Sequence, residues 1–130
     1  MNQKERKIRK QKIFGICSKE SYQTRDSVEF HSDGYKHFMV KAAIGYVLRN
    51  NNHRFLTEAE FPNGRMADVV DLHTGLVYEV ETNASRKDVE EKLGNFWDYE
   101  PIDDVIVIDP TDYPDELDEI REKVKGELVL

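Results

Sequence analysis

The sequence predicts an α/β domain in which helices pack on a mixed β-sheet. Apolar residues recur at helical spacing in three segments, and four short runs have the apolar pattern of strands. Turn-forming residues separate these segments, whose order is helix, three strands, helix, strand, helix. With 130 residues, of which 38% are hydrophobic, the chain is long enough for one domain with a single core.

The chain begins with a strongly basic segment. Residues 1–12 hold six Lys and Arg side chains against Glu5 alone, a net charge of +5. We expect a flexible arm, which is either a solvated leader or an electrostatic handle for nucleic acid. Residues 13–130 would then form the single folded domain.

A helix and a strand are predicted next. Helical spacing of apolar residues covers residues 35–49, where Ser32 or Asp33 would cap the helix and a run of asparagines would end it. Residues 54–61 have the composition of a strand, and Pro62 ends that run.

The middle of the chain predicts a hairpin followed by a helix. Residues 66–72 and 76–82 are strand-like runs joined by a short turn. Ser85 would cap the next helix, because a serine side chain accepts a hydrogen bond from the first turn. The apolar stripe of this helix has helical spacing and consists of Val89, Leu93, Phe96 and Trp97.

The end of the chain predicts a strand and a closing helix. Residues 103–109 form a short apolar run between acids, which indicates a buried central strand that is parallel to a neighbour. Pro114 would open the final helix, since proline is favoured in the first turn. The predicted buried face of this helix consists of Leu117, Ile120 and Val124.

Composition narrows the class of protein. Cys17 is the single cysteine, which excludes an internal disulfide and a zinc site made of cysteines. Neither an apolar run of about 18 residues nor a signal-peptide pattern is present, so we expect a soluble, cytoplasmic protein without a membrane partner. The net charge is −7, and −12 without the basic segment, which speaks against a surface that coats DNA throughout.

Acidic side chains interrupt two of the apolar strand runs. Asp68 lies in the first, and Glu79 and Glu81 lie in the second. Because side chains alternate along a strand, Asp68 and Glu79 would converge on one side of a hairpin. Carboxylates that meet in a partly buried site repel each other, and a hard cation such as Mg²⁺ removes that penalty. A cation held in this way can activate water beside a phosphodiester. Other acids, namely Glu58, Asp71, Asp103 and Asp104, are expected on the solvent face.

The order of these motifs resembles the PD-(D/E)XK nuclease superfamily. The nearest relatives are the competence CoiA-like nucleases and the archaeal Holliday-junction resolvases. The resemblance covers residues 32–109, with the matching positions His37 and Lys41 on the first helix, Glu58 or Glu60 on a strand, Arg65, Asp68 and Val69 on the next strand, and then Glu79, Glu81 and Ser85.

The resemblance implies a restriction-endonuclease-like, three-layer α/β/α fold and a metal-dependent DNA endonuclease. Mg²⁺ or Mn²⁺ would be held by Asp68, Glu79 and the carbonyl of Val80, together with Glu60. Glu81 would assist through a second metal or a water. It stands where the superfamily usually has a lysine, so the positive charge would come from Lys41, Lys87 or Lys92. The groups that would contact DNA phosphates are Arg65, His37 and Lys87. A homodimer would suit a cut in both strands.

Two other interpretations stay open. One is a nuclease-like module that has lost catalysis and binds nucleic acid or protein, which the glutamate at position 81 favours. The other is an acidic interaction protein whose carboxylates lie on the surface, and it predicts no effect of divalent cations on stability. His37 and Lys41 would then belong to a solvated helix face, and Arg65 would pair with a neighbouring acid.

Overall fold

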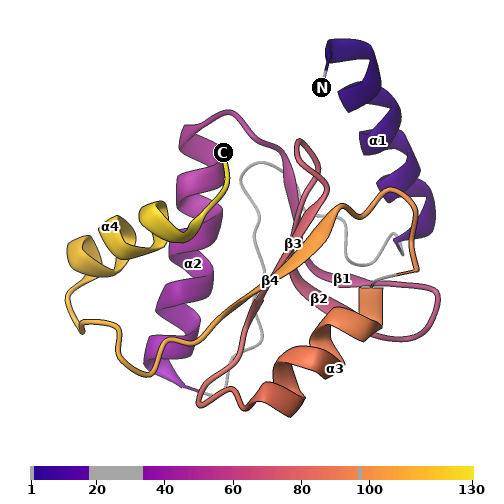
Figure 1. The fold of residues 1–130 in the computed structure, drawn as a ribbon. Helices are drawn as coiled ribbons and strands as arrows, with labels where there is room; N and C mark the ends of the chain where they lie inside the picture. The colour runs from indigo at the N-terminus through magenta and orange to yellow at the C-terminus, as the bar shows by residue number, and fades with distance from the viewer. Residues whose placement is uncertain (1, 18–33, 97) are drawn as a thin grey trace.

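The computed structural model describes residues 2–17, 34–96 and 98–130. The helices are α1 (Gln3–Ile16), α2 (Tyr35–Asn50), α3 (Arg86–Phe96) and α4 (Leu117–Glu127) (Figure 1). The strands are β1 (Phe55–Glu60), β2 (Met66–Asp71), β3 (Leu76–Val80) and β4 (Asp104–Ile108). The predicted α/β class and the order of elements after α1 are confirmed. The expected cap at Ser32 or Asp33 is wrong, because Gly34 is the cap residue of α2 and provides no side-chain hydrogen bond. The place of Trp97 in the α3 stripe lies outside the described residues.

The four strands form one mixed sheet in the order β1-β2-β3-β4. The first three strands are antiparallel neighbours, and β4 pairs parallel to β3, as the sequence predicts. The expectation that β4 is a central strand is wrong, because β4 lies at an edge of the sheet. A continuous apolar run indicates that both faces of a strand are buried. An edge strand whose two faces are covered by helices has the same pattern as a central strand, so the pattern does not distinguish them.

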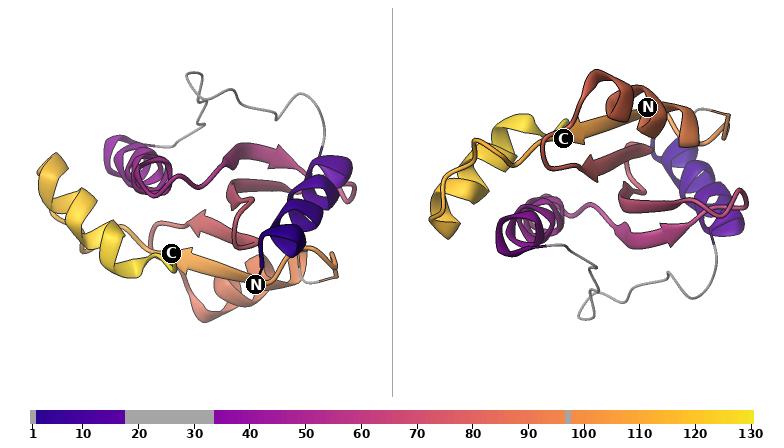
Figure 2. Two further views of the ribbon diagram at one scale, coloured as in Figure 1. Left: turned by 90° about the horizontal axis from the view of Figure 1, so that it is seen from above. Right: turned by 90° about the horizontal axis from the view of Figure 1, so that it is seen from below.

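Helices cover the two faces of the sheet (Figures 1 and 2). One core cluster packs α2 and α4 against the face that carries Val69 and Tyr78. A second cluster packs α1 and α3 against the face that carries Val70 and Val77. The chain therefore folds as helices on both sides of a sheet. Because successive side chains of β2 and β3 point to opposite faces, these strands contribute to both core clusters.

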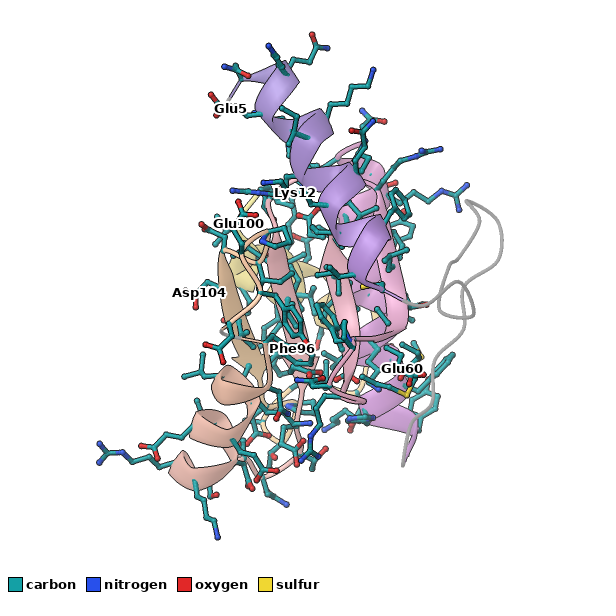
Figure 3. All side chains as sticks on the ribbon, turned by 90° about the vertical axis from the view of Figure 1, so that its right-hand side faces the viewer. Glu5, Lys12, Glu60, Phe96, Glu100 and Asp104 are labelled. Atoms are coloured by element: carbon teal, nitrogen blue, oxygen red, sulfur yellow. The ribbon has the colours of Figure 1, made fainter. Side chains whose placement is uncertain are left out.

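The basic segment is helical and not a flexible arm. α1 begins at the cap residue Asn2, whose side chain accepts a hydrogen bond from the Glu5 backbone amide, and its far end buries Ile13 completely. Lys12 pairs with Glu100 at 2.9 Å (Figure 3). Arg9 donates to the carbonyl of Thr74. These contacts with the body of the protein order a segment whose composition alone indicated disorder.

The start of α3 agrees with the sequence prediction, whereas the start of α4 does not. Ser85 and Asp88 cap α3 reciprocally, each side chain accepting from the other residue's backbone amide, as predicted for Ser85. In contrast, α4 begins at Leu117 and not at Pro114, and Leu117 is 54% exposed. Ile120 and Val124 form the buried face without it. Within the described ranges, no helix is both long and apolar enough to cross a membrane.

Candidate functional site

The candidate site lies where β2 and β3 stop pairing through their backbones. Regular pairing links Val69 to Tyr78 and Val70 to Val77. One residue further, side chains replace the backbone partners: the Asp68 amide donates to Glu79 Oε2 at 3.0 Å, and the Val80 amide donates to Asp68 Oδ2 at 2.7 Å. The two acids are therefore inserted between the strands, and the structure brings Asp68 and Glu79 together.

Lys41 of α2 reaches the same cluster. Its Nζ lies 2.9 Å from Asp68 Oδ1 and 3.2 Å from Glu58 Oε1, and the lysine side chain is only 3% exposed. Burial lowers the pKa of Lys41, but the nearby carboxylates of Asp68 and Glu58 outweigh that effect and raise it. The ammonium is thus held in its charged form between two acids.

The backbone of β1 changes direction at Glu58. This residue has φ of 49°, a left-handed conformation that is uncommon for a residue with a side chain. The next residue, Ala59, packs in the cluster on the α1–α3 face. Phe55, which strict alternation would place on the same face as Ala59, packs on the α2–α4 face. Strict alternation is broken here, and the Glu58 carboxylate reaches α2 with only 8% of the residue exposed. The expectation that Glu58 is a surface acid is therefore wrong.

Alternation is also broken at Asp68. The sequence places Asp68 on the same face as Val70, but Val70 packs on the α1–α3 face while the Asp68 carboxylate contacts Lys41 of α2. Asp68 thus lies at the crossover between the two faces of the sheet. From there it contacts Lys41 with one oxygen and the Val80 amide with the other.

Glu79 is the most strongly perturbed acid of the cluster. It is fully buried, and burial together with the charge of Asp68 raises its pKa from 4.5 to about 9. Oε2 accepts the Asp68 amide, whereas Oε1 is buried without a hydrogen-bond partner among the described residues. A buried carboxyl with one unused oxygen is costly unless something binds there.

Two further predicted residues lie beside this cluster. His37 Nε2 contacts the Val80 carbonyl oxygen at 2.8 Å, which joins the start of α2 to the end of β3. On the other side of the sheet, Lys92 of α3 lies 3.7 Å from Glu81 Oε2, and its charge lowers the pKa of Glu79. Both Lys41 and Lys92 therefore act on the acids, Lys41 by direct contact with Asp68 and Lys92 from the opposite face.

Three predicted residues lie at the margin. Glu60 ends β1 and is exposed, so Glu58 and not Glu60 is the strand acid that enters the cluster (Figure 3). Arg65 is exposed in the turn before β2, where its backbone is held by Asn63 and Phe61. Lys87 is exposed in the first turn of α3. All three side chains are exposed to solvent, and none is part of the buried cluster.

The donor atoms suit a hard cation. Asp68 and Glu79 offer carboxylate oxygens and Val80 offers a carbonyl oxygen, which are the ligand types that Mg²⁺ prefers. The unpartnered Oε1 of Glu79 is one such oxygen that the fold leaves unused. In the described parts of the chain, no group of three or more His, Cys, Asp and Glu side chains is already arranged around a metal position. The Lys41 ammonium instead lies against Asp68 and Glu58.

Sequence reasoning missed a second buried acid, Asp71. It is fully buried, and its carboxylate accepts from Thr74 Oγ1 at 2.8 Å and from the His73 amide at 2.9 Å. His53 Nδ1 lies 2.9 Å from the same carboxylate, and its ring stacks on that of His73. The expectation of a surface role for Asp71 is wrong, and the turn that follows it, Leu72 to Gly75, was the available signal, because Asp commonly caps such turns.

Comparison of the chain with protein-family models, curated proteins and solved structures gave no match. What the fold and site define directly is a mixed α/β protein with a buried carboxylate–lysine cluster at the β2–β3 junction.

Proposed function

We propose that the protein is a Mg²⁺- or Mn²⁺-dependent DNA endonuclease of the restriction-endonuclease-like, PD-(D/E)XK type. The observation that carries the proposal is the buried Glu79 carboxyl beside Asp68, with its pKa raised to about 9 and one oxygen without a partner. A fold gains nothing from such a group on its own, whereas strongly perturbed acids are typical of functional sites. The surrounding basic residues supply the contacts that a phosphodiester would need.

Each residue of the cluster has a role in this proposal. Asp68, Glu79 and the Val80 carbonyl would hold the cation, which would lower the pKa of a bound water and offset charge on the phosphate. His37 fixes the position of the Val80 carbonyl through the 2.8 Å contact. Lys41, which already lies 2.9 Å from Asp68, would orient the attacking water or contact the phosphate.

The outer residues would serve the DNA. Arg65 and Lys87, both exposed, would contact backbone phosphates, and an arginine can do so with two parallel hydrogen bonds. Lys92 would keep Glu81 paired, so that this acid does not repel the substrate. One site per chain cuts one strand, so a symmetric pair of chains would cut both.

Cleavage of labelled duplex, single-stranded and branched DNA, with Mg²⁺, Mn²⁺ or EDTA, tests the proposal. We expect metal-dependent cutting by the wild type and a loss of at least about a hundredfold in Asp68→Ala and Glu79→Ala, as is usual when charge stabilisation at a reaction centre is removed. Asp104→Ala is the matched control, because Asp104 is an exposed acid on the edge strand. Absence of cutting by the wild type on every substrate, or equal activity in all four proteins, would refute the nuclease.

One observation favours a second candidate, the nuclease-like binding module without catalysis. Lys41 already gives Asp68 and Glu58 a shared counter-charge, so part of their negative charge is balanced without a metal. This candidate predicts DNA binding that is the same in EDTA and in Mn²⁺, and no cleavage with either metal.

A further inference from the structure

We infer that α1 is a nucleic-acid-binding helix that follows the phosphate backbone independently of the metal. The helix carries six Lys and Arg residues and one acid, while the rest of the chain has a net charge of −12. The inference rests on the proposed function in taking nucleic acid as the partner. It concerns a different surface, however, and it does not require that the acid cluster cuts DNA.

The position of α1 is fixed by contacts that run from its middle, at Arg9, to its C-terminal end. Ile13 is fully buried in the cluster that it shares with α3, and Arg9 donates to the Thr74 carbonyl. The chain turns closely beneath the helix at Gly75, where a Cβ atom would lie 2.7 Å from the Pro101 carbonyl oxygen and 2.9 Å from Arg9 Cδ. These contacts place α1 against the hairpin turn.

The N-terminal half of α1 extends beyond the sheet, as Figures 1 and 3 show. Lys4, Lys7 and Lys10 are spaced three apart and form a row along one side of the helix. None of the three forms an ion pair with any residue that the structure describes. No acidic side chain in the described parts of the chain therefore pairs with this row.

The row is unfavourable for the helix by itself. Like charges one turn apart repel, and cations near a helix N-terminus oppose the helix dipole. A ligand of opposite charge would remove both penalties. Lys4 to Lys10 span about 9 Å of helix, and a DNA duplex presents a phosphate charge about every 1.7 Å along its axis.

The distribution of apolar residues favours nucleic acid over an anionic membrane. A helix that lies on a membrane needs an exposed apolar face that can enter the lipid. In α1 the residues Ile13, Phe14 and Ile16 pack against the body of the protein, and the N-terminal half exposes only Ile8 among large hydrophobic side chains. The free surface of α1 is thus charged and not amphipathic, which suits contacts to phosphates.

Binding of a fluorescent 20-base-pair DNA duplex in EDTA, followed by anisotropy from 50 to 200 mM salt, tests the inference. The test protein is the full chain with Lys4→Gln, Lys7→Gln and Lys10→Gln. The matched control removes three cations from α4 through Arg121→Gln, Lys123→Gln and Lys125→Gln. Circular dichroism checks that α1 and the fold are retained in both.

We expect the α1 variant to bind about tenfold or more weakly at 50 mM salt, with a salt slope smaller than that of the wild type by about 2.7, since each phosphate contact contributes about 0.9. The α4 variant should keep the wild-type slope. Equal slopes in the wild type and the α1 variant, equal losses in both variants, or no DNA binding by the wild type would overturn the inference. So would tighter binding to vesicles of anionic lipid than to DNA, if it is lost in the α1 variant.

Separate measurements of binding and cleavage distinguish this inference from the proposed function. Binding is measured in EDTA for the wild type and the α1 variant, and cleavage is measured with Mg²⁺ or Mn²⁺ for the wild type and Asp68→Ala. If no protein cleaves DNA but the α1 variant still loses affinity, the nuclease is refuted and the binding helix stands. If cleavage depends on Asp68 but the α1 variant binds DNA as the wild type does, the binding helix is refuted and the nuclease stands.

Discussion

At the scale of single residues, Glu79 makes a large contribution to the pH dependence of stability. The unfolded carboxyl loses its proton near pH 4.5, whereas the folded one keeps it until about pH 9, because burial and Asp68 raise its pKa. Between these values the folded state binds more protons than the unfolded state. The free energy of unfolding therefore falls as the pH rises, by about 1.4 kcal/mol per unit for this group.

Glu79→Gln should abolish this dependence. A glutamine keeps the shape of the protonated glutamate but never ionises, so we expect the variant to be more stable than the wild type by about 3 kcal/mol at pH 7, with the gain disappearing near pH 4.5. Urea unfolding of both proteins at several pH values between 4.5 and 8 measures the difference. A gain that is constant with pH would contradict the assignment, and Asp104→Asn serves as the exposed control.

The same substitution should remove any metal-dependent cleavage, because the amide is a poorer ligand and carries no charge. The expected result is a protein that is more stable and inactive. That combination is typical of sites whose strain serves function.

At the scale of elements, the hairpin turn determines how α1 is held. Gly75 has φ of 76°, which disfavours residues with a side chain, and a Cβ atom there would overlap the Pro101 carbonyl oxygen. We expect Gly75→Ala to lower the free energy of unfolding by about 2 kcal/mol, with the loss centred on the contact between α1 and the turn.

Gly94→Ala is the matched control for that prediction. Gly94 lies inside α3, where a Cβ atom would meet nothing within 4 Å, so the variant should gain up to about 1 kcal/mol from helix propensity. Denaturant unfolding of both variants, with hydrogen exchange of the α1 amides, measures the two effects. A Gly75→Ala protein as stable as the wild type would show that α1 is not held at this turn.

The existence of the strands and the hairpin of β2 and β3 could be predicted, because apolar runs and turn residues are local signals. The edge position of β4 could not, because it depends on how distant strands are ordered in the sheet. α1 could not, because its order depends on Ile13 and on contacts to Thr74 and Glu100 that are far away in the sequence. Propensity gives no information about such docking.

The candidate site could be predicted only in part, because some of its contacts depend on the folded backbone and not on local sequence pattern. Asp68 and Glu79 stand out as acids within apolar strand runs, so the pattern of the sequence identifies them. Lys41 was indicated only by the family resemblance, because its helical pattern suits a solvated face equally well. The entry of Glu58 into the cluster depends on its left-handed backbone, and a rule that assumes extended strands places that side chain on the wrong face. The contact between His37 and the Val80 carbonyl joins two elements 43 residues apart, which one sequence does not reveal.

At the scale of the whole molecule, loss of the positive charge at the β2–β3 junction should lower the free energy of unfolding. Lys41→Met keeps the aliphatic stem but leaves Glu58 and Asp68 without their buried counter-charge, which typically costs about 3–5 kcal/mol. If the acids can hold a divalent cation, Mn²⁺ should recover about 2–3 kcal/mol of this loss at saturating concentration. Thermal and urea unfolding in EDTA and in Mn²⁺ would measure both effects.

Lys36→Met is the control for this prediction, since Lys36 lies on the same helix but pairs with the exposed Asp115. Its loss should be below about 1 kcal/mol and insensitive to Mn²⁺. A Lys41→Met protein that Mn²⁺ stabilises no more than the control would mean that the acids do not bind the cation, and the acidic interaction protein would then be the better interpretation.

The edge position of β4 has a consequence for how copies of the protein behave at high concentration. Its five residues include the apolar run Val105–Ile108, and one side of the strand has no partner strand in the described sheet. Such an edge is a template for the strand of another molecule. Asp103, Asp104 and Asp109 are exposed at the two ends of the run. Their negative charges repel the same edge of a second copy, so these aspartates act as gatekeepers against aggregation.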